Sequence, residues 1–373
     1  MPGPHLHIVC LDVPYPPDYG GVFDLFYKIR TLHELGVRIH LHCFEYGRGR
    51  PDALRAYCET VHYYNRSSFL TSLFRRAPYI VGSRASPALL DNLLADGHPV
   101  LLEGVHCTWF LHTGSLSGRR VAIRLHNVEY IYYRELARAT RNPVKKIFFL
   151  RESALLEKYE RRLLQHSLVI AVSEQDQQIC RQQFGATDVR YLPVFLPFGE
   201  VTAPGGTGTY CLYHGNLAVA ENEQAARWLI TEVFIDLDIP LVVAGKNPSR
   251  ALRSLVARHP GVSLVAGPDD AEMEHLIAGA QIHVLPSWNA TGIKIKLLHA
   301  LFCGRHVVTN ATAVRGTSLA GCCHVAGDAR SFAALVHVLQ QQPFDLTLQE
   351  QRRELLREFD HERNARQLMQ WLS

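Results

Sequence analysis

The chain has 373 residues, of which 47% are hydrophobic and 20% are charged, and its formal net charge at pH 7 is +4. This usage is that of an ordinary globular protein, and because one hydrophobic core rarely grows beyond about 250–300 residues, we expect two domains. The mild positive charge excludes a dedicated nucleic-acid binder and suits an anionic substrate or an acidic membrane surface.

The first half of the chain alternates between short apolar runs and helical patterns. After the first run, apolar residues recur at helical spacing over residues 22–35, and Gly36 provides a C-terminal cap. Strands that alternate with helices predict a parallel, doubly wound sheet. We expect these strands at residues 5–12, 37–44, 60–64, 99–103, 120–125, 167–172 and 189–192.

A segment rich in proline and glycine, residues 193–208, interrupts this pattern and is typical of a linker between domains. A second alternating pattern follows it, so the fold class is predicted to be α/β with two Rossmann-like domains. We place an N-terminal domain at 1–196, a C-terminal domain at 197–355, and a final helix at 356–373 that returns to the N-terminal domain. The second set of strands is expected at residues 209–214, 240–244, 262–266, 281–285, 305–309 and 322–325.

Residues 286–304 carry the most informative local pattern. A strand ends at Pro286, a short polar loop reaches Gly292, and a helix is expected from about Ile293 to Gly304. Glycine permits close approach of a phosphate to the backbone, and free N–H groups at the helix start attract an anion. Lys294 and Lys296 add positive charge there, so we predict a diphosphate site. An ordinary strand-loop-helix unit with solvated lysines is the alternative.

The same segment resembles the donor-binding motif of the family-4 glycosyltransferases. The matching residues are Pro286-Ser287, Gly292, Ala300, Gly304 and Val307-Val308. The resemblance implies a GT-B fold, in which two Rossmann-like domains face each other across a cleft. It also implies retaining transfer of a sugar from a nucleoside diphosphate sugar to a hydroxyl acceptor, without a metal or other cofactor. The chain departs from the motif at Thr291 and His299, where the family has glutamates that contact the donor sugar and the ribose.

Other positions of the second domain follow from the same resemblance. Gly215 and Asn216 correspond to the turn after the first strand of the donor domain. Lys246, which follows the next strand, is a candidate phosphate ligand, with a solvated turn residue as the alternative. The complete set of expected donor-binding residues is Gly20, Gly21, Gly215, Asn216, Lys246, Asn289, Thr291, Gly292, Ile293, Lys296 and His299.

In the first domain, two loops are expected near the transferred sugar and the acceptor. Asp18, Gly20 and Gly21 occupy the first strand-to-helix turn, and plain turn chemistry is the alternative reading of the glycines. His126 follows a strand, and its imidazole can bond a sugar hydroxyl or take up a proton near pH 7. We assign catalytic roles to His126 and Lys294, and acceptor contacts to Asp18, Asn127 and Glu129. A structural histidine is the alternative for His126.

Two further patterns remain open. His5 and His7, like His40 and His42, share a strand face, which suits zinc, but no third ligand is evident and no metal site is predicted. The basic, amphipathic residues 134–162 predict either a peripheral membrane contact, if the acceptor is a lipid, or a helical pair packed on the first domain.

Cellular location follows from cysteine usage and from apolar segments. The nine cysteines lack paired spacing and indicate buried free thiols in a reducing compartment. No signal peptide or membrane-spanning segment is recognisable. We therefore expect a cytoplasmic protein, peripheral at the inner face of the membrane if the acceptor is a lipid.

Two other functions stay open at this point. One is a catalytically degenerate GT-B subunit that binds an active transferase, which the substitutions at Thr291 and His299 favour. The other is a GT-B-like sugar-nucleotide epimerase, which requires acid and base carboxylates that the sequence does not place.

Overall fold

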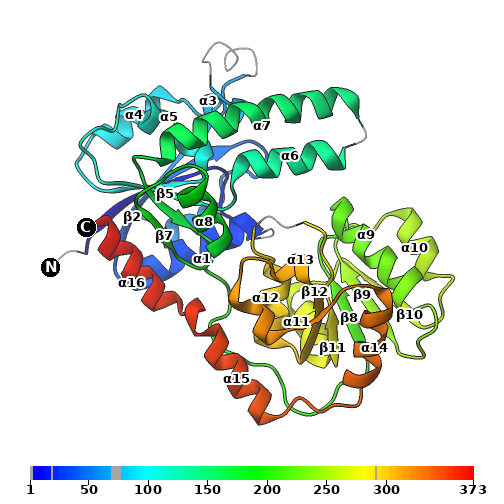
Figure 1. Cartoon of the computed structure of the whole chain (residues 1–373). Coiled ribbons are helices and arrows are strands. Elements are labelled where there is room, and N and C mark those ends of the chain that lie inside the picture. The colour runs from blue at the N-terminus through cyan, green and yellow to red at the C-terminus, as the bar shows by residue number, and fades with distance from the viewer. Residues whose placement is uncertain (1–2, 18–19, 69–76, 141, 290–291) are drawn as a thin grey trace. The chain divides into compact units, whose positions relative to one another are not determined.

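A computed structural model describes residues 3–17, 20–68, 77–140, 142–289 and 292–373 (Figure 1). The chain divides into two compact units. Unit 1 comprises Met1–Pro197 and Phe359–Ser373 together with Thr291–Ile293, and unit 2 comprises Phe198–Ala290 and Lys294–Glu358. Each unit is built on its own parallel sheet, which confirms the predicted α/β class with two Rossmann-like folds.

The sheet of unit 1 has the strand order β3-β2-β1-β4-β5-β6-β7, with every neighbouring pair parallel. The order reverses between β1 and β4, and ligands of such sheets bind where the carboxyl ends of these two strands diverge. The strands are β1 His5–Cys10, β2 Arg38–Glu45, β3 Thr60–Asn65, β4 Val100–Glu103, β5 Val121–Leu125, β6 Leu168–Ala171 and β7 Val189–Tyr191.

Successive residues of these strands point to opposite faces, and each face is covered by helices. Ile8 packs with Ile29 of α1 and Leu368 of α16, whereas Val9 packs with Leu89 of α4. Both faces are therefore buried, which explains the near-continuous apolar runs in the sequence. The helices of unit 1 are α1 Gly20–Glu34, η1 Asp52–Ala56, α3 Tyr79–Gly82, α4 Pro87–Leu94, η2 Val105–Cys107, α5 Trp109–His112, α6 Glu129–Ala139, α7 Pro143–Leu164, α8 Glu174–Gln182 and α16 His361–Leu372.

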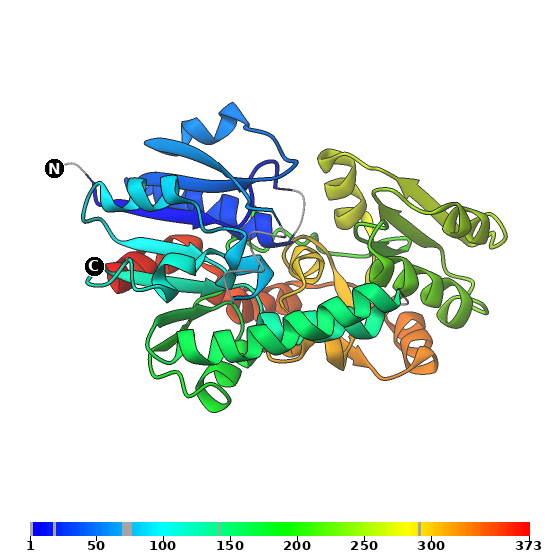
Figure 2. The same ribbon diagram turned by 90° about the horizontal axis from the view of Figure 1, so that it is seen from above.

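The basic segment forms the predicted helical pair, α6 and α7, and α7 is the long green helix of Figure 2. The carboxylate of Glu160 in α7 accepts the backbone N–H groups of Glu129 (2.8 Å) and Tyr130 (3.0 Å) and so caps the start of α6. The hydroxyl of Ser153 donates to the carbonyl of Tyr130 at 2.8 Å. These contacts fix the geometry of the chain directly after β5.

The sheet of unit 2 has the order β10-β9-β8-β11-β12-β13, again with parallel neighbours. Its order reverses between β8 and β11. The strands are β8 Cys211–His214, β9 Leu241–Gly245, β10 Val262–Ala266, β11 Ile282–Val284, β12 His306–Asn310 and β13 His324–Ala326. The helices are α9 Ala220–Trp228, η3 Leu229–Val233, α10 Arg250–Val256, α11 Asp270–Gly279, α12 Ile295–Cys303, α13 Ala311–Val314, η4 Ser318–Cys322, α14 Ala329–Leu339, α15 Leu346–Leu356 and η5 Arg357–Phe359.

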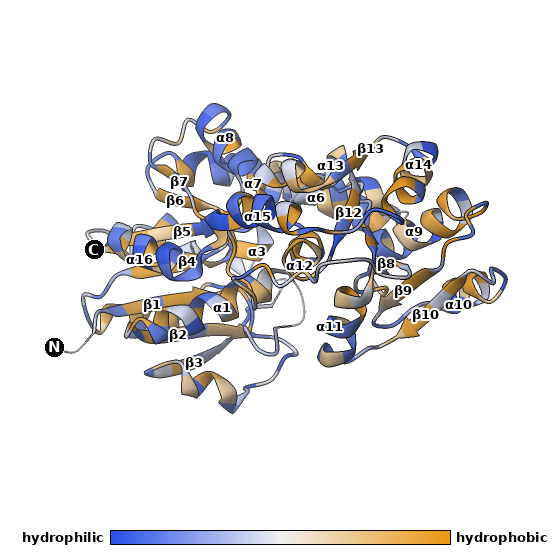
Figure 3. Ribbon diagram, turned by 90° about the horizontal axis from the view of Figure 1, so that it is seen from below, coloured by the Kyte–Doolittle hydropathy of each residue, from blue (hydrophilic) through white to orange (hydrophobic). Residues whose placement is uncertain are grey.

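The last two long helices pack on different units. The buried guanidinium of Arg352 in α15 donates to the carbonyls of Leu301 (3.2 Å), Gly304 and Arg305 (both 2.5 Å), all in unit 2. Figure 3 shows the rest of α15 as mostly hydrophilic and β1 as strongly hydrophobic. In α16, the carbonyl of Trp371 accepts from Arg120 of unit 1 at 2.6 and 3.0 Å. The polypeptide therefore finishes unit 2 before it returns to unit 1.

Candidate functional site

Beside the reversal point of unit 2, the chain after β8 approaches the end of β9 closely. Gly215 follows β8, and a Cβ atom added at Gly245, the end of β9, would lie 1.8 Å from the carbonyl oxygen of Gly215. Only glycine fits at position 245. The N–H of Leu217 donates to the carbonyl of Lys246 at 3.0 Å, which holds the turn at residues 215–217 against the end of β9.

The loop after β11 leads into α12, which begins at Ile295 rather than at the predicted Ile293. The later start has a backbone cause, because Gly292 adopts a φ of +64° and Lys294 is extended, so neither is helical. The carbonyl of Lys294 accepts from Leu297 and Leu298. Among the described residues, no side chain forms a capping hydrogen bond to α12, and the first N–H groups of a helix have no intrahelical partner. The helix start thus keeps the anion-binding character that the sequence predicts.

Lys296 is brought to this point by residues of β8 and α9. Its Nζ donates to the Oδ1 of Asn222 (2.9 Å) and to the hydroxyl of Tyr213 (3.1 Å), and lies 4.8 Å from the centre of the Tyr213 ring. Asn222 also donates to the carbonyl of Asn216 at 2.9 Å, so one amide joins the turn to the lysine. Burial lowers the pKa of Lys296 to about 8, an effect that Glu221 opposes and Lys294 reinforces.

Glu221 has a defined role at the loop after β11. Its Oε1 accepts from the hydroxyl of Ser287 at 2.6 Å and from the N–H of Asn289 at 3.3 Å. The side chain of Asn310 bonds both the N–H (3.0 Å) and the carbonyl (2.8 Å) of Ser287. The acidic start of α9 therefore shapes the loop that precedes α12.

The other donor-side candidates of unit 2 occupy different environments. The imidazole of His299 stacks on Phe198 with 5.0 Å between ring centres, and burial lowers its pKa to about 4. It is therefore neutral at pH 7 and has one N–H donor and one acceptor nitrogen. Lys246 is exposed. Thr291 lies outside the described residues.

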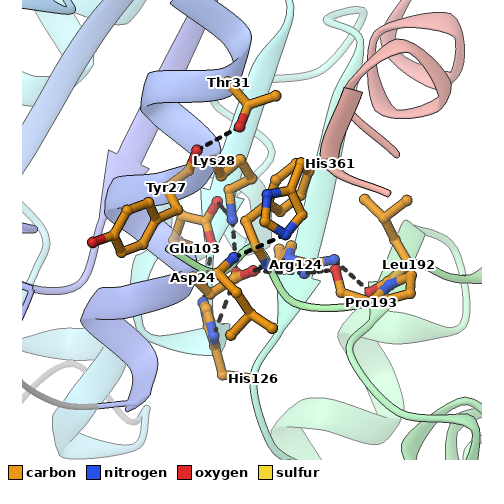
Figure 4. A network of polar contacts seen from close by, with 12 residues as sticks. Asp24, Tyr27, Lys28, Thr31, Glu103, Arg124, His126, Leu192, Pro193 and His361 are labelled. Carbon is orange, nitrogen blue, oxygen red and sulfur yellow. Dashed lines mark hydrogen bonds and ion pairs between the residues drawn. The ribbon is translucent and has the colours of Figure 1, made fainter. Parts of the chain in front are cut away.

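At the reversal point of unit 1, four charged side chains form a buried network (Figure 4). Lys28 Nζ lies 2.9 Å from Asp24 Oδ2 and 2.8 Å from Glu103 Oε1. Arg124 donates to both oxygens of Asp24 at 2.9 and 3.0 Å and to the carbonyls of Leu192 and Pro193. The four residues carry two positive and two negative charges, so the network is neutral overall.

Ionisation of both carboxylates is supported by their neighbours. Burial raises the pKa of Asp24, but the charges of Arg124 and Lys28 outweigh it and hold that pKa well below its usual value. Burial likewise opposes ionisation of Glu103, and Lys28 and His126 lower its pKa below the ordinary range. Burying these four charges costs desolvation free energy, and removing one of them would cost more, because a buried charge would then lack its partner.

His126 contacts this network from the end of β5. Its Nε2 lies 2.9 Å from Glu103 Oε2, its Nδ1 lies 3.8 Å from Asp24 Oδ2, and its side chain is 10% exposed. The two carboxylates thus orient the ring. One atom each of Asp24, Glu103 and His126 would be close enough for a shared metal ion. Lys28 and Arg124 already neutralise both carboxylates, so this donor set does not suit a cation.

The remaining candidates of unit 1 are only partly accessible. Gly20 and Gly21 open helix α1 instead of lying in the turn before it. Asn127 is half-buried, whereas Glu129 is 4% exposed, and burial raises its pKa to about 8. The Glu129 side chain is thus buried, near Arg84 and Asp176, and its expected contact with an acceptor stays a prediction. Asp18 lies outside the described residues.

Sequence reasoning missed the residues that hold the candidates in place. In unit 2 these are Tyr213, Glu221 and Asn222, and in unit 1 they are Asp24, Lys28, Glu103 and Arg124. The four residues of unit 1 could have been found in the sequence as charged residues inside an otherwise apolar strand or helix face. Arg124 within the strand Val121–Leu125 is an example. Such a residue is buried only when it is paired.

Similarities to known proteins are found for the sequence and for the fold. Residues 208–342 match the family model described as "Glycosyl transferases group 1". A protein of Klebsiella pneumoniae, described as an uncharacterized 44.6 kDa protein in cps region, is 26% identical over an alignment of 328 residues that covers 83% of this chain and 84% of that protein. The structure of sucrose-phosphate synthase from Thermosynechococcus elongatus matches with a TM-score of 0.69 at 15% identity over 98% of both chains.

A second solved structure with a similar fold contains a bound nucleotide. Alr3699/HepE from Anabaena, solved in complex with UDP and glucose, has a TM-score of 0.63 and 11% identity, with 98% of each chain covered. At these identities the likeness concerns the fold of the whole chain.

Proposed function

We propose that this chain, which has the GT-B fold and whose unit 2 matches the group 1 glycosyltransferases, transfers a sugar from a nucleoside diphosphate sugar to a hydroxyl acceptor. One observation carries the proposal. The tethered ammonium of Lys296 and the uncapped start of α12 meet beside the Gly215 turn, at the reversal point of the sheet. This is where an α/β sheet binds a nucleotide, and both groups favour an anion.

The donor is proposed to bind through its diphosphate. The N–H groups at the start of α12 and the ammonium groups of Lys294 and Lys296 would neutralise charge that develops on the leaving diphosphate. Gly215 and Gly292 are proposed to let the diphosphate approach the backbone closely. His299 would bond a donor hydroxyl as a neutral imidazole, where a carboxylate would otherwise serve.

On the acceptor side, His126 is proposed to contact the transferred sugar or the attacking hydroxyl. Its ring is oriented by Glu103, as a catalytic imidazole requires. Retention of anomeric configuration is part of the proposal, and the leaving diphosphate then accepts the proton of the acceptor. A dedicated protein base is therefore unnecessary.

The activity is tested with a panel of nucleotide sugars. We expect thermal stabilisation by one class among uridine, guanosine and thymidine diphosphates, and slow hydrolysis or transfer from the corresponding sugar nucleotide. Lys294→Ala should weaken binding of that diphosphate roughly tenfold, because one charged contact is lost. Lys158→Ala, an exposed lysine of α7, serves as the control and should leave the affinity unchanged.

The opposite result identifies the alternative function. If no nucleotide sugar binds or reacts, and an active transferase co-purifies with the chain, the protein is a degenerate binding subunit. Unchanged affinity in Lys294→Ala alone would remove Lys294 from the site.

The acceptor is proposed to be a growing polysaccharide or a glycolipid at the cytoplasmic face of the membrane. The relative from a cps region supports polysaccharide synthesis. Val144, Ile147 and Leu150 of α7 are 74%, 69% and 48% exposed, beside the exposed Lys145 and Lys146. Apolar side chains next to lysines favour an anionic lipid surface. Across the described residues, no helix has the length and apolar character needed to cross a bilayer.

Vesicle binding checks this surface. We expect co-sedimentation with vesicles that contain anionic lipid, and roughly tenfold weaker binding of Ile147→Glu, because an apolar contact becomes a repelled carboxylate. Ile235→Glu, at a residue of unit 2 that is 61% exposed, is the matched control. Equal binding by both variants, or no binding by the wild type, contradicts the proposed surface.

A further inference from the structure

Histidines gather at the amino-terminal edge of the sheet in unit 1. His5 is the first residue of β1, His40 lies on β2, and His98 precedes β4. The sequence indicates that His5 shares a strand face with His7, and His40 with His42, but provides no third ligand. The structure adds His98, whose ring stacks on that of His5 with 4.4 Å between centres.

The nitrogen atoms of these three rings lie close together. His5 Nδ1 and His40 Nε2 are 2.9 Å apart, and one nitrogen from each of the three residues falls within 4.8 Å of the others. Two imidazole nitrogens on one tetrahedral zinc ion are roughly 3.3 Å apart, given bonds of about 2.0–2.1 Å. The three rings are stacked on one another, so binding one ion through all three requires the rings to turn out of this arrangement. All three side chains are partly exposed, so an ion can enter from solvent.

Groups next to the three rings leave a histidine nitrogen available to a metal ion and add negative charge nearby. The Nδ1 of His40 lies 3.1 Å from the hydroxyl of Thr60, which can accept its N–H and leave the Nε2 lone pair free for an ion. The carboxylate of Asp96 adds negative charge one ring further in, 3.0 Å from His7, although Arg119 at 3.4 Å partly offsets it.

We propose that His5, His40 and His98 bind a divalent transition-metal ion such as Zn²⁺, each through one imidazole nitrogen. Imidazole nitrogens suit Zn²⁺, Co²⁺, Ni²⁺ and Cu²⁺, and a water molecule completes a tetrahedral shell. His5 then carries its proton on Nε2, a change of tautomer that releases no proton. The ion links β1, β2 and the segment before β4. It lies at the edge of the sheet opposite His126, so it stabilises unit 1 and takes no part in sugar transfer.

The test uses the full-length chain without a histidine tag, freed of metal by chelation. Titration with Zn²⁺, followed by calorimetry and thermal unfolding, should show one ion per chain at this site and a raised melting temperature. Bound Co²⁺ should give the intense visible absorption of tetrahedral coordination. His98→Ala should weaken the affinity at least roughly tenfold and abolish the thermal shift. His337→Ala, an exposed histidine of α14, should behave as the wild type.

A second variant, His5→Gln, should lose the ion in the same way. Equal unfolding curves of the metal-free wild type and both variants establish that the variants are folded. The proposal is overturned if the wild type binds no Zn²⁺, if both variants bind it as the wild type does, or if His337→Ala weakens binding equally. The chain has 20 histidines, so this last control separates the site from scattered surface binding.

Discussion

Replacing Asp24 with asparagine is expected to lower the free energy of unfolding by about 3–5 kcal/mol, the effect of breaking a buried ion network from one side. Asp24 accepts from Arg124, Lys28 and the N–H of Phe195, and all its polar contacts are buried. In the variant, one amide faces two buried cations and its NH₂ group points at a donor. The charges of Arg124 and Lys28 then lack their counterpart.

Urea unfolding followed by circular dichroism measures this loss. Asp52→Asn is a matched control, because Asp52 pairs with Arg55 on the surface and its side chain is 92% exposed. An exposed pair contributes at most about 1 kcal/mol. If Asp24→Asn unfolds within that margin of the wild type, the network is not a main source of stability in unit 1.

The pH dependence of the same variant has a definite sign. Because the pKa of Asp24 is lowered by folding, its contribution is present at neutral pH and is lost as the pH falls below about 4, where the unfolded chain takes up the proton. The difference in stability between the wild type and Asp24→Asn should therefore shrink in acid.

Replacing Lys296 with methionine is expected to weaken nucleoside diphosphate binding by roughly 10- to 100-fold at pH 7. The lysine ammonium is tethered by Asn222 and Tyr213 before any ligand arrives, so little ordering is needed on binding. Methionine retains the length of the side chain but removes the charge.

The pKa of Lys296 adds a second signature. Since this pKa is about 8, the wild-type ammonium loses its proton as the pH rises from 7 to 9, and diphosphate affinity should fall over that interval. Lys296→Met should show a flat profile over the same range. Calorimetric titration at several pH values checks both points, with Lys158→Met as the control. A wild-type affinity that stays constant from pH 7 to 9 would contradict a direct role of the Lys296 charge.

Most of the fold could be predicted from the sequence. Every strand expected in the two domains is present within two residues of its expected bounds. The reason is physical. The strands of a parallel sheet covered on both faces are continuous apolar runs, whereas the helices between them have apolar residues only at every third or fourth position. The sequence did not predict local backbone geometry, as at Lys294, whose extended conformation makes α12 begin two residues later than expected.

The supporting residues of the candidate site were much harder to foresee. Asp24 and Arg124 meet although 100 positions separate them, and no local pattern encodes such a pairing. The same is true of Asn222 with Lys296, and of His98 with His5. Motif resemblance identifies positions that face a ligand, but it does not identify the side chains that hold those positions still.

The return of α16 to unit 1 has a consequence for synthesis of the protein. Leu368 and Leu372 belong to the same core as β1, and the N–H of Leu196 points at the imidazole of His361, 3.3 Å away. Unit 2 is thus inserted into the sequence of unit 1, and while unit 2 is being synthesised, unit 1 lacks the helix α16 that packs on its α1. Its core closes only after residues 359–373 have been translated, so the first-made unit is the last to be finished.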